Sequence, residues 1–110
     1  MFIKTLWWLL CAHAFCDYAL QIPFKNPNAD VDRATYGPWW WGMLAHAFIN
    51  GAGVALVTGS FKLGLLETFV HFITDSSKCN GVLNANEDQI IHVVSKAVWA
   101  VCATVHPTLR

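Results

Sequence analysis

Charged residues are scarce in this chain of 110 residues. Only 13% of the residues are Asp, Glu, Lys or Arg, whereas a soluble globular domain carries ~25%. Seven basic residues balance seven acidic ones, and no basic stripe is present that would bind nucleic acid. Cysteine is sparse too, with four residues and no Cys-x-x-Cys pair. This argues against a zinc site with sulfur ligands and predicts free or packing thiols.

Apolar side chains fill most of the sequence instead. They make up 55% of it, with a mean hydropathy of +0.41 and six tryptophans. Tryptophan gathers where a membrane meets water, and the run Trp39 to Trp41 predicts such an interfacial belt. The apolar segments are hydrophobic all round rather than along one stripe. We therefore expect an integral protein of the bacterial inner (cytoplasmic) membrane, with the lipid bilayer as its partner. A soluble bundle with very apolar faces is the alternative.

Four apolar segments make up one predicted domain, 1–110. Pro38 opens the second segment, and proline is well suited to the first position of a helix. Asn86 with Gln89 resembles a capping box at the start of the last segment. Short connections make consecutive helices antiparallel. The sequence thus predicts an all-α fold, an antiparallel four-helix transmembrane bundle with both termini on one side. The expected helices cover about 2–22, 39–59, 61–78 and 86–105.

Histidines and carboxylates recur at one spacing within these segments. Residues four apart lie on the same face of a helix. Three such pairs are His13 with Asp17, His71 with Asp75, and Asp88 with His92, and a weaker fourth is His46 with Asn50. In an up-down-up-down bundle all four pairs fall near the same end. Groups of this kind are costly in apolar surroundings unless they meet one another or a metal ion.

Imidazole and carboxylate are the usual ligands of catalytic zinc and of two-metal centres. We expect one or two divalent ions, zinc or manganese, which would activate water for hydrolysis. The catalytic residues expected are Glu67 and Asp75, because a spare carboxylate can act as general base or orient a ligand histidine. The alternative is a polar network that only joins the helices. The expected metal ligands are His13, Asp17, His46, His71, Asp75, Asp88 and His92.

Two further features concern packing. Glu67 lies four residues before His71, and Lys96 four residues after His92. On antiparallel helices these offsets reach the same depth, which predicts a buried ion pair beneath the site. The alternative for Lys96 is a side chain that extends to the membrane interface. Glycines of the middle segments, Gly51 among them, are expected to allow close helix packing.

The order and spacing of these residues resemble a known family. The pattern is His13-x-x-x-Asp17-x-x-x-Gln21, then His46, then Glu67-x-x-x-His71-x-x-x-Asp75-x-x-Lys78, then Asp88-Gln89-x-x-His92. Along nearly the whole chain it resembles the small bacterial and phage membrane proteins catalogued as domain of unknown function 3307. That family implies no particular activity. A looser similarity, in the kind of site, is to inner-membrane proteins described as metal-dependent hydrolases.

Two functions follow from these features. The first is a membrane-embedded, metal-dependent hydrolase that acts on a lipid or a phosphoester. The second is a non-enzymatic phage or bacterial membrane protein that alters the host envelope and uses the polar residues as a structural network. A haem carrier would need only two facing histidines and leaves the carboxylates unexplained. A homo-oligomer is compatible with both functions.

Overall fold

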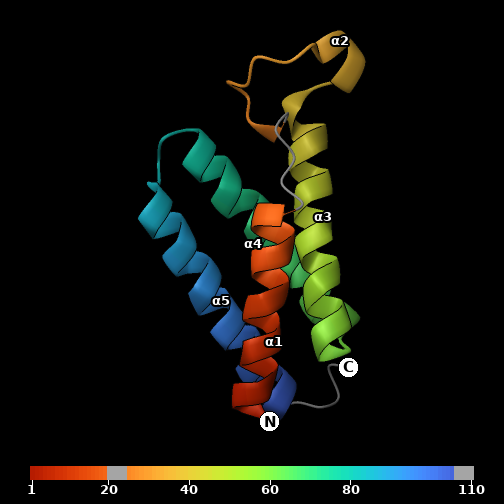
Figure 1. Cartoon of the computed structure of the whole chain (residues 1–110), viewed down its shortest axis with the longest axis vertical. Helices are drawn as coiled ribbons and strands as arrows, with labels where there is room; N and C mark the ends of the chain where they lie inside the picture. Colours follow the sequence, from red (N-terminus) through yellow and green to blue (C-terminus); the bar gives the residue numbers. More distant parts are fainter. Residues whose placement is uncertain (20–24, 106–110) are drawn as a thin grey trace.

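The computed structural model describes residues 1–19 and 25–105, and in these ranges every regular element is a helix. The longer helices run in alternating directions beside one another, so that successive ones are antiparallel (Figure 1). The predicted all-α class is therefore confirmed. The elements are α1 (Phe2–Ala14), the π-helical segment η1 (Phe15–Ala19), α2 (Arg33–Tyr36), α3 (Trp39–Thr58), α4 (Phe61–Cys79) and α5 (Ala85–Val105).

The bounds of α3, α4 and α5 agree with the predicted helices to within one residue. Local chemistry explains the sharp ends between α3 and α4. Gly59 ends α3 in the left-handed conformation, at φ 71°, which glycine adopts without a steric cost. Ser60 then begins α4 by accepting a hydrogen bond from the backbone N–H of Leu63 at 3.1 Å. The predicted end of the first helix at Ile22 lies outside the described residues.

The capping box of α5 lies two residues earlier than predicted. Asn84 and Glu87 bond reciprocally: the Glu87 N–H donates to Asn84 Oδ1 at 2.8 Å, and the Asn84 N–H donates to Glu87 Oε1 at 3.1 Å. The predicted box of Asn86 and Gln89 is therefore wrong. A glutamate is also the better partner for the positive end of the helix dipole. Gln89 is left free to point into the bundle.

A short helix interrupts the polar loop between the first two long helices. Asp32 begins α2 by accepting hydrogen bonds from the Thr35 hydroxyl at 2.7 Å and the Ala34 N–H at 3.0 Å. These bonds, that of Thr35 first, hold the pKa of the exposed Asp32 carboxyl below its usual value. The sequence analysis predicted only a loop here. A single turn of helix carries too few residues to show a hydrophobic period.

The interior is divided along its length into an apolar half and a polar half. At one end Phe2 of α1 and Cys102 of α5 pack against the apolar cluster, so α1 begins where α5 ends (Figure 1). The polar half lies toward the opposite end. The apolar cluster consists of Leu9, Val54, Leu63, Trp99, Ala100 and Ala103.

The surface carries many large apolar side chains, whereas much of the interior is polar. Among the described residues, 14 polar or charged residues are buried, compared with 9 apolar ones. Large apolar side chains face outward instead: Leu56 is 86% exposed, Phe61 74% and Phe69 66%. Soluble domains normally show the reverse distribution. Of the described helices only α3 has the length and composition to cross a membrane by itself, so the transmembrane four-helix bundle stays a prediction.

Small residues hold α3 and α4 together, as the sequence analysis predicted. A Cβ atom added at Gly51 would lie 2.6 Å from the carbonyl oxygen of Gly64, and one added at Gly64 would lie 2.8 Å from the Cβ of Ala55. The two backbones therefore approach as closely as glycine allows. This contact fixes the relative position of His46 on α3 and His71 on α4.

Candidate metal centre

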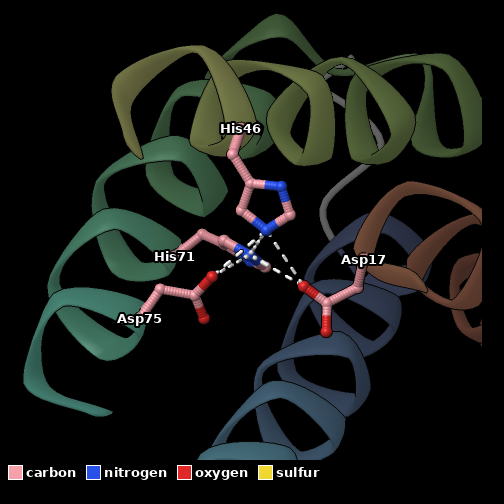
Figure 2. Close-up of side chains that lie close together, drawn as sticks. All are labelled: Asp17, His46, His71 and Asp75. Atoms are coloured by element: carbon pink, nitrogen blue, oxygen red, sulfur yellow. Dashed lines mark hydrogen bonds and ion pairs between the residues drawn. The ribbon is translucent and has the colours of Figure 1, made fainter. Parts of the chain in front are cut away.

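Four side chains from three helical segments meet at one point in the polar half. Asp17 comes from η1, His46 from α3, and His71 and Asp75 from α4, and all four point toward one another (Figure 2). Their atoms Asp17 Oδ1, His46 Nε2, His71 Nε2 and Asp75 Oδ2 lie within 4.8 Å of one another, and all four residues are buried. We call these residues the four-ligand group.

The separations within the four-ligand group match those of a coordination tetrahedron. His46 Nε2 lies 3.1 Å from Asp17 Oδ1, 3.1 Å from Asp75 Oδ2 and 3.2 Å from His71 Nε2. His71 Nε2 lies 3.3 Å from Asp17 Oδ1 and 3.4 Å from Asp75 Oδ2. A tetrahedral ion with ligands at ~2.0–2.1 Å requires edges of about 3.3–3.4 Å. The donor atoms are thus already spaced as metal ligands.

Hydrogen bonding alone does not explain this convergence. A neutral imidazole nitrogen carries either one proton or one lone pair. The Nε2 atom of His46 nevertheless has three neighbours within 3.2 Å, which are two carboxylate oxygens and the Nε2 atom of His71. One proton cannot satisfy three partners, whereas a cation at their centre would bind all four atoms.

The π-helical segment η1 carries Asp17. A π turn holds an extra residue, which changes the direction of the side chains that follow it, and such turns are frequent at functional sites. Asp17 Oδ2 lies 3.8 Å from His13 Nε2, its predicted partner, while Asp17 Oδ1 lies 3.1 Å from His46 Nε2 on α3. The sequence analysis expected an uninterrupted α-helix here and did not foresee the π turn.

Of the other three predicted pairs, two are confirmed and one is wrong. His71 lies 3.4 Å from Asp75, and His92 lies 3.3 Å from Asp88, so these two pairs are confirmed. The predicted pairing of His46 with Asn50 is wrong. The Asn50 amide donates to the backbone carbonyl of His46 at 3.1 Å rather than contacting its ring, since a side-chain amide can bond the carbonyl one turn earlier.

A second group of donors adjoins the first. His92 Nε2 lies 3.0 Å from Asp75 Oδ1 and 3.3 Å from Asp88 Oδ1, and the three residues are buried. Six of the seven predicted metal ligands therefore fall into these two groups. His13 belongs to neither: its ring lies 5.1 Å from that of His92, and its Nε2 atom lies 3.3 Å from Gln89 Oε1.

Glu67 lies behind His71, away from the convergence point. Its Oε1 atom lies 3.2 Å from His71 Nδ1 and accepts from Lys96 Nζ at 2.5 Å, which confirms the predicted ion pair. Its Oε2 atom accepts from Trp99 Nε1 at 2.6 Å. A proton on Nδ1 of His71, held by the carboxylate, leaves the Nε2 lone pair facing the four-ligand group. Of the two roles that the sequence left open for Glu67, this arrangement favours orientation of a ligand histidine.

Three residues of the site were not predicted as site residues from the sequence: Lys25, Gln89 and Trp99. Lys25 is buried and donates to Asp75 Oδ2 at 2.8 Å. The Gln89 amide donates to Asp17 Oδ2 at 3.3 Å. Gln89 stands in the family pattern, which could have pointed to it. Trp99 lies three residues after Lys96 and seven after His92, so the helix period could have pointed to it as well. Lys25 carries no such signal, because it lies outside the long helices and reaches Asp75 across 50 positions of the chain.

The buried charges of the described residues do not balance. Four carboxylates are buried with two lysines, Lys25 and Lys96. Lys78, whose side chain is 33% exposed, lies 3.7 Å from Asp88 Oδ2 at the edge of the cluster. Even with Lys78 included, one positive charge is missing, and a metal ion or a protonated imidazole would supply it. The four carboxylates belong to Asp17, Glu67, Asp75 and Asp88.

Comparison of the chain with known protein families, with curated proteins and with solved structures finds no match of any of the three kinds. The resemblance drawn from residue spacing therefore stays a prediction, and Gln21 of that pattern lies outside the described residues. Fold and site together define an all-helical protein whose interior holds histidine and aspartate groups with the composition and spacing of a metal centre.

Proposed function

We propose that this chain is a membrane-embedded metalloprotein that uses a divalent ion, zinc or manganese, to hydrolyse a lipid or phosphoester at the bilayer surface. The four-ligand group would hold the ion. One observation carries the proposal: five separations among its four donor atoms lie between 3.1 and 3.4 Å, as tetrahedral ligands require. The two imidazoles and two carboxylates also suit both ions.

The distribution of side chains supports the membrane. Polar groups fill one half of the interior, and many large apolar side chains lie on the exterior, an arrangement that lipid favours and water does not. Exposed tryptophans lie in the first turn of α3 (Trp40, Trp41), and two more lie in the middle of α1 (Trp7, Trp8). The position of the first pair suits an aromatic belt. At 20 residues, α3 is ~30 Å long, the thickness of the hydrocarbon layer.

The surrounding residues would bind and orient what the site holds. A divalent ion supplies Lewis-acid chemistry: it lowers the pKa of water and polarises a phosphoryl or carbonyl oxygen. Glu67 acts as a positioning residue for His71, because its Oε1 atom contacts His71 Nδ1 and its carboxylate is fully buried on the far side of that ring from the four-ligand group. Gln89 fixes the remaining oxygen of Asp17.

A non-enzymatic membrane protein is the second candidate, and one contact favours it. Lys25 Nζ lies 2.8 Å from Asp75 Oδ2, an oxygen of the four-ligand group. A lysine in that place neutralises the carboxylate without any metal ion, as a purely structural network would require. In that case the cluster joins the helices and the protein has no hydrolytic activity.

Metal content distinguishes the two candidates. The protein is purified in mild detergent, equilibrated with Zn²⁺ or Mn²⁺, freed of excess ion and analysed by mass spectrometry for metal per chain. We expect bound metal in the wild type and less metal per chain in His46→Ala and in His71→Ala. The control Asp30→Asn, a carboxylate change on the exposed loop, should bind as much metal as the wild type. A folded wild type without metal would overturn the proposal and favour the structural network.

Activity and location have separate tests. The metal-loaded protein is assayed on nitrophenyl esters of phosphate and of fatty acids, and a chelator should abolish hydrolysis until metal is restored.

Membranes that contain the protein are washed with alkaline carbonate, which strips peripheral proteins. Retention in the pellet supports the bilayer, and release into the wash would contradict it.

A further inference from the structure

The carboxylate of Asp75 faces two groups of donors at once. Its Oδ2 atom belongs to the four-ligand group and lies 3.1 Å from His46 Nε2. Its Oδ1 atom lies 3.0 Å from His92 Nε2 on the other side. Asp75 is only 1% exposed, so both oxygens contact protein donors rather than water. A carboxylate with its two oxygens in two adjoining donor groups can bridge two metal ions.

Asp88 provides an independent sign of a missing ligand. Its Oδ2 atom accepts from the Gln89 amide at 3.2 Å and lies 3.7 Å from Lys78 Nζ. Its Oδ1 atom is fully buried and has no hydrogen-bond partner among the described residues, although it lies 3.3 Å from His92 Nε2. A buried oxygen without a partner is costly. Here it points into a group that already holds an imidazole and a second carboxylate.

We propose that a second divalent ion binds between Asp75, Asp88 and His92, with Asp75 bridging it to the first ion. This inference rests on the proposed function. One donor atom from each of these three residues lies within 4.8 Å of the others, and His92 Nε2 lies 3.0 Å from Asp75 Oδ1 and 3.3 Å from Asp88 Oδ1. Three protein ligands leave a coordination position open to water or substrate, as in catalytic sites. Two ions bridged in this way would lie ~3.5–4 Å apart, the separation of hydrolytic two-metal centres.

The two positions differ in their expected roles. The four-ligand group supplies four protein donors, so an ion there would activate water only as a fifth ligand, whereas the second position supplies three and leaves a coordination position free. The first ion would therefore be held more firmly, and the second would bind water more readily. Two divalent ions would bring four positive charges where the buried carboxylates and lysines lack only one, so bound anions such as hydroxide or a substrate phosphate would carry the other three.

Metal stoichiometry tests the second ion. Wild type and variants are equilibrated with Mn²⁺ in detergent, and metal per chain is measured by mass spectrometry. We expect two ions in the wild type, one in Asp88→Asn and two in the loop control Asp30→Asn. His92→Gln repeats the test through another ligand if Asp88→Asn fails to fold, and circular dichroism reports the folding of each variant.

Electron paramagnetic resonance provides a readout that a structural role would not change. Two Mn²⁺ ions on one carboxylate are exchange-coupled, so the wild type should give a coupled signal and Asp88→Asn the signal of isolated Mn²⁺. One ion per chain in the wild type, unaffected by Asp88→Asn, would overturn the second ion and leave the first. No bound ion in any folded variant would overturn the proposed function as well.

Discussion

The buried ion pair of Glu67 and Lys96 allows a sharp test of the interior. Lys96 is 1% exposed and donates to Glu67 at 2.5 Å. The change Lys96→Met keeps the length of the side chain and removes its charge. The Glu67 carboxylate then stays buried with only Trp99 and His71 as donors. Breaking a buried pair on one side costs ~3–5 kcal/mol of unfolding free energy, because the remaining charge has no counterion.

The reverse change should cost a similar amount for a different reason. Glu67→Gln leaves the ammonium group of Lys96 buried without a counterion. Glutamine also offers a single acceptor oxygen where the carboxylate accepts from both Lys96 and Trp99 on two oxygens. Its amide N–H₂ must therefore face one of these donors, which adds a donor without an acceptor.

The double variant removes both charges together. Replacing a whole buried pair by neutral groups of similar volume is often close to neutral. We therefore expect Glu67→Gln with Lys96→Met to be milder than either single change. Because the double change then costs less than either single change, the coupling energy must exceed the larger single cost, so it should be at least ~3 kcal/mol, the upper end for residues in direct contact.

The measurement is a double-mutant cycle on unfolding in detergent, with metal removed so that ion binding does not contribute. Lys62→Met is the matched control, because Lys62 is an exposed lysine and its loss should leave stability unchanged. Additive costs of the two single changes would refute the reasoning. So would a Lys96→Met variant as stable as the control.

Three further predictions concern other parts of the chain. Gly51→Ala should destabilise the protein by ~1–3 kcal/mol, because the new Cβ would lie 2.6 Å from the backbone oxygen of Gly64. The control Gly53→Ala, whose new Cβ has its nearest contact at 3.3 Å, should be tolerated. Denaturant unfolding of both variants measures the two free-energy changes. Lys25→Met should tighten metal binding at least ~10-fold in a calorimetric titration, because the ammonium competes with the ion for Asp75 Oδ2; unchanged affinity would contradict the competition. Reporters fused to the two ends should give the same topology signal, and opposite signals would exclude an even number of crossings.

Local properties of the sequence predicted much of this structure. Apolar segments bounded by turn residues fix the helices, and the four-residue spacing of His71 and Asp75 fixes their common face. Even the pair of Glu67 and Lys96 followed from equal offsets on antiparallel helices. These features depend on helix periodicity alone, which is why they could be foreseen.

Features that depend on packing could not be predicted in the same way. Two overlapping candidates for the capping box stand in the sequence, and only the structure distinguishes Asn84 with Glu87 from the pair two residues later. The π turn at Asp17 has no recognisable sequence signal. Lys25 reaches Asp75 across 50 positions of the chain. Such a contact follows from the placement of whole helices and loops, not from a local period.

The shortest contacts of the site run between helices rather than within them. His46 lies 3.1 Å from Asp17 and His92 lies 3.0 Å from Asp75, whereas the pairs four residues apart in the chain lie 3.2 to 3.8 Å apart. No helix carries enough donors for a site of its own, so the site forms only when the helices assemble. An ion that binds only the assembled bundle must stabilise it, by ~2.7 kcal/mol at a concentration 100 times the Kd. Metal binding and helix assembly are therefore linked in the proposed protein, and a ligand change that weakens metal binding must lower the stability of the metal-loaded bundle.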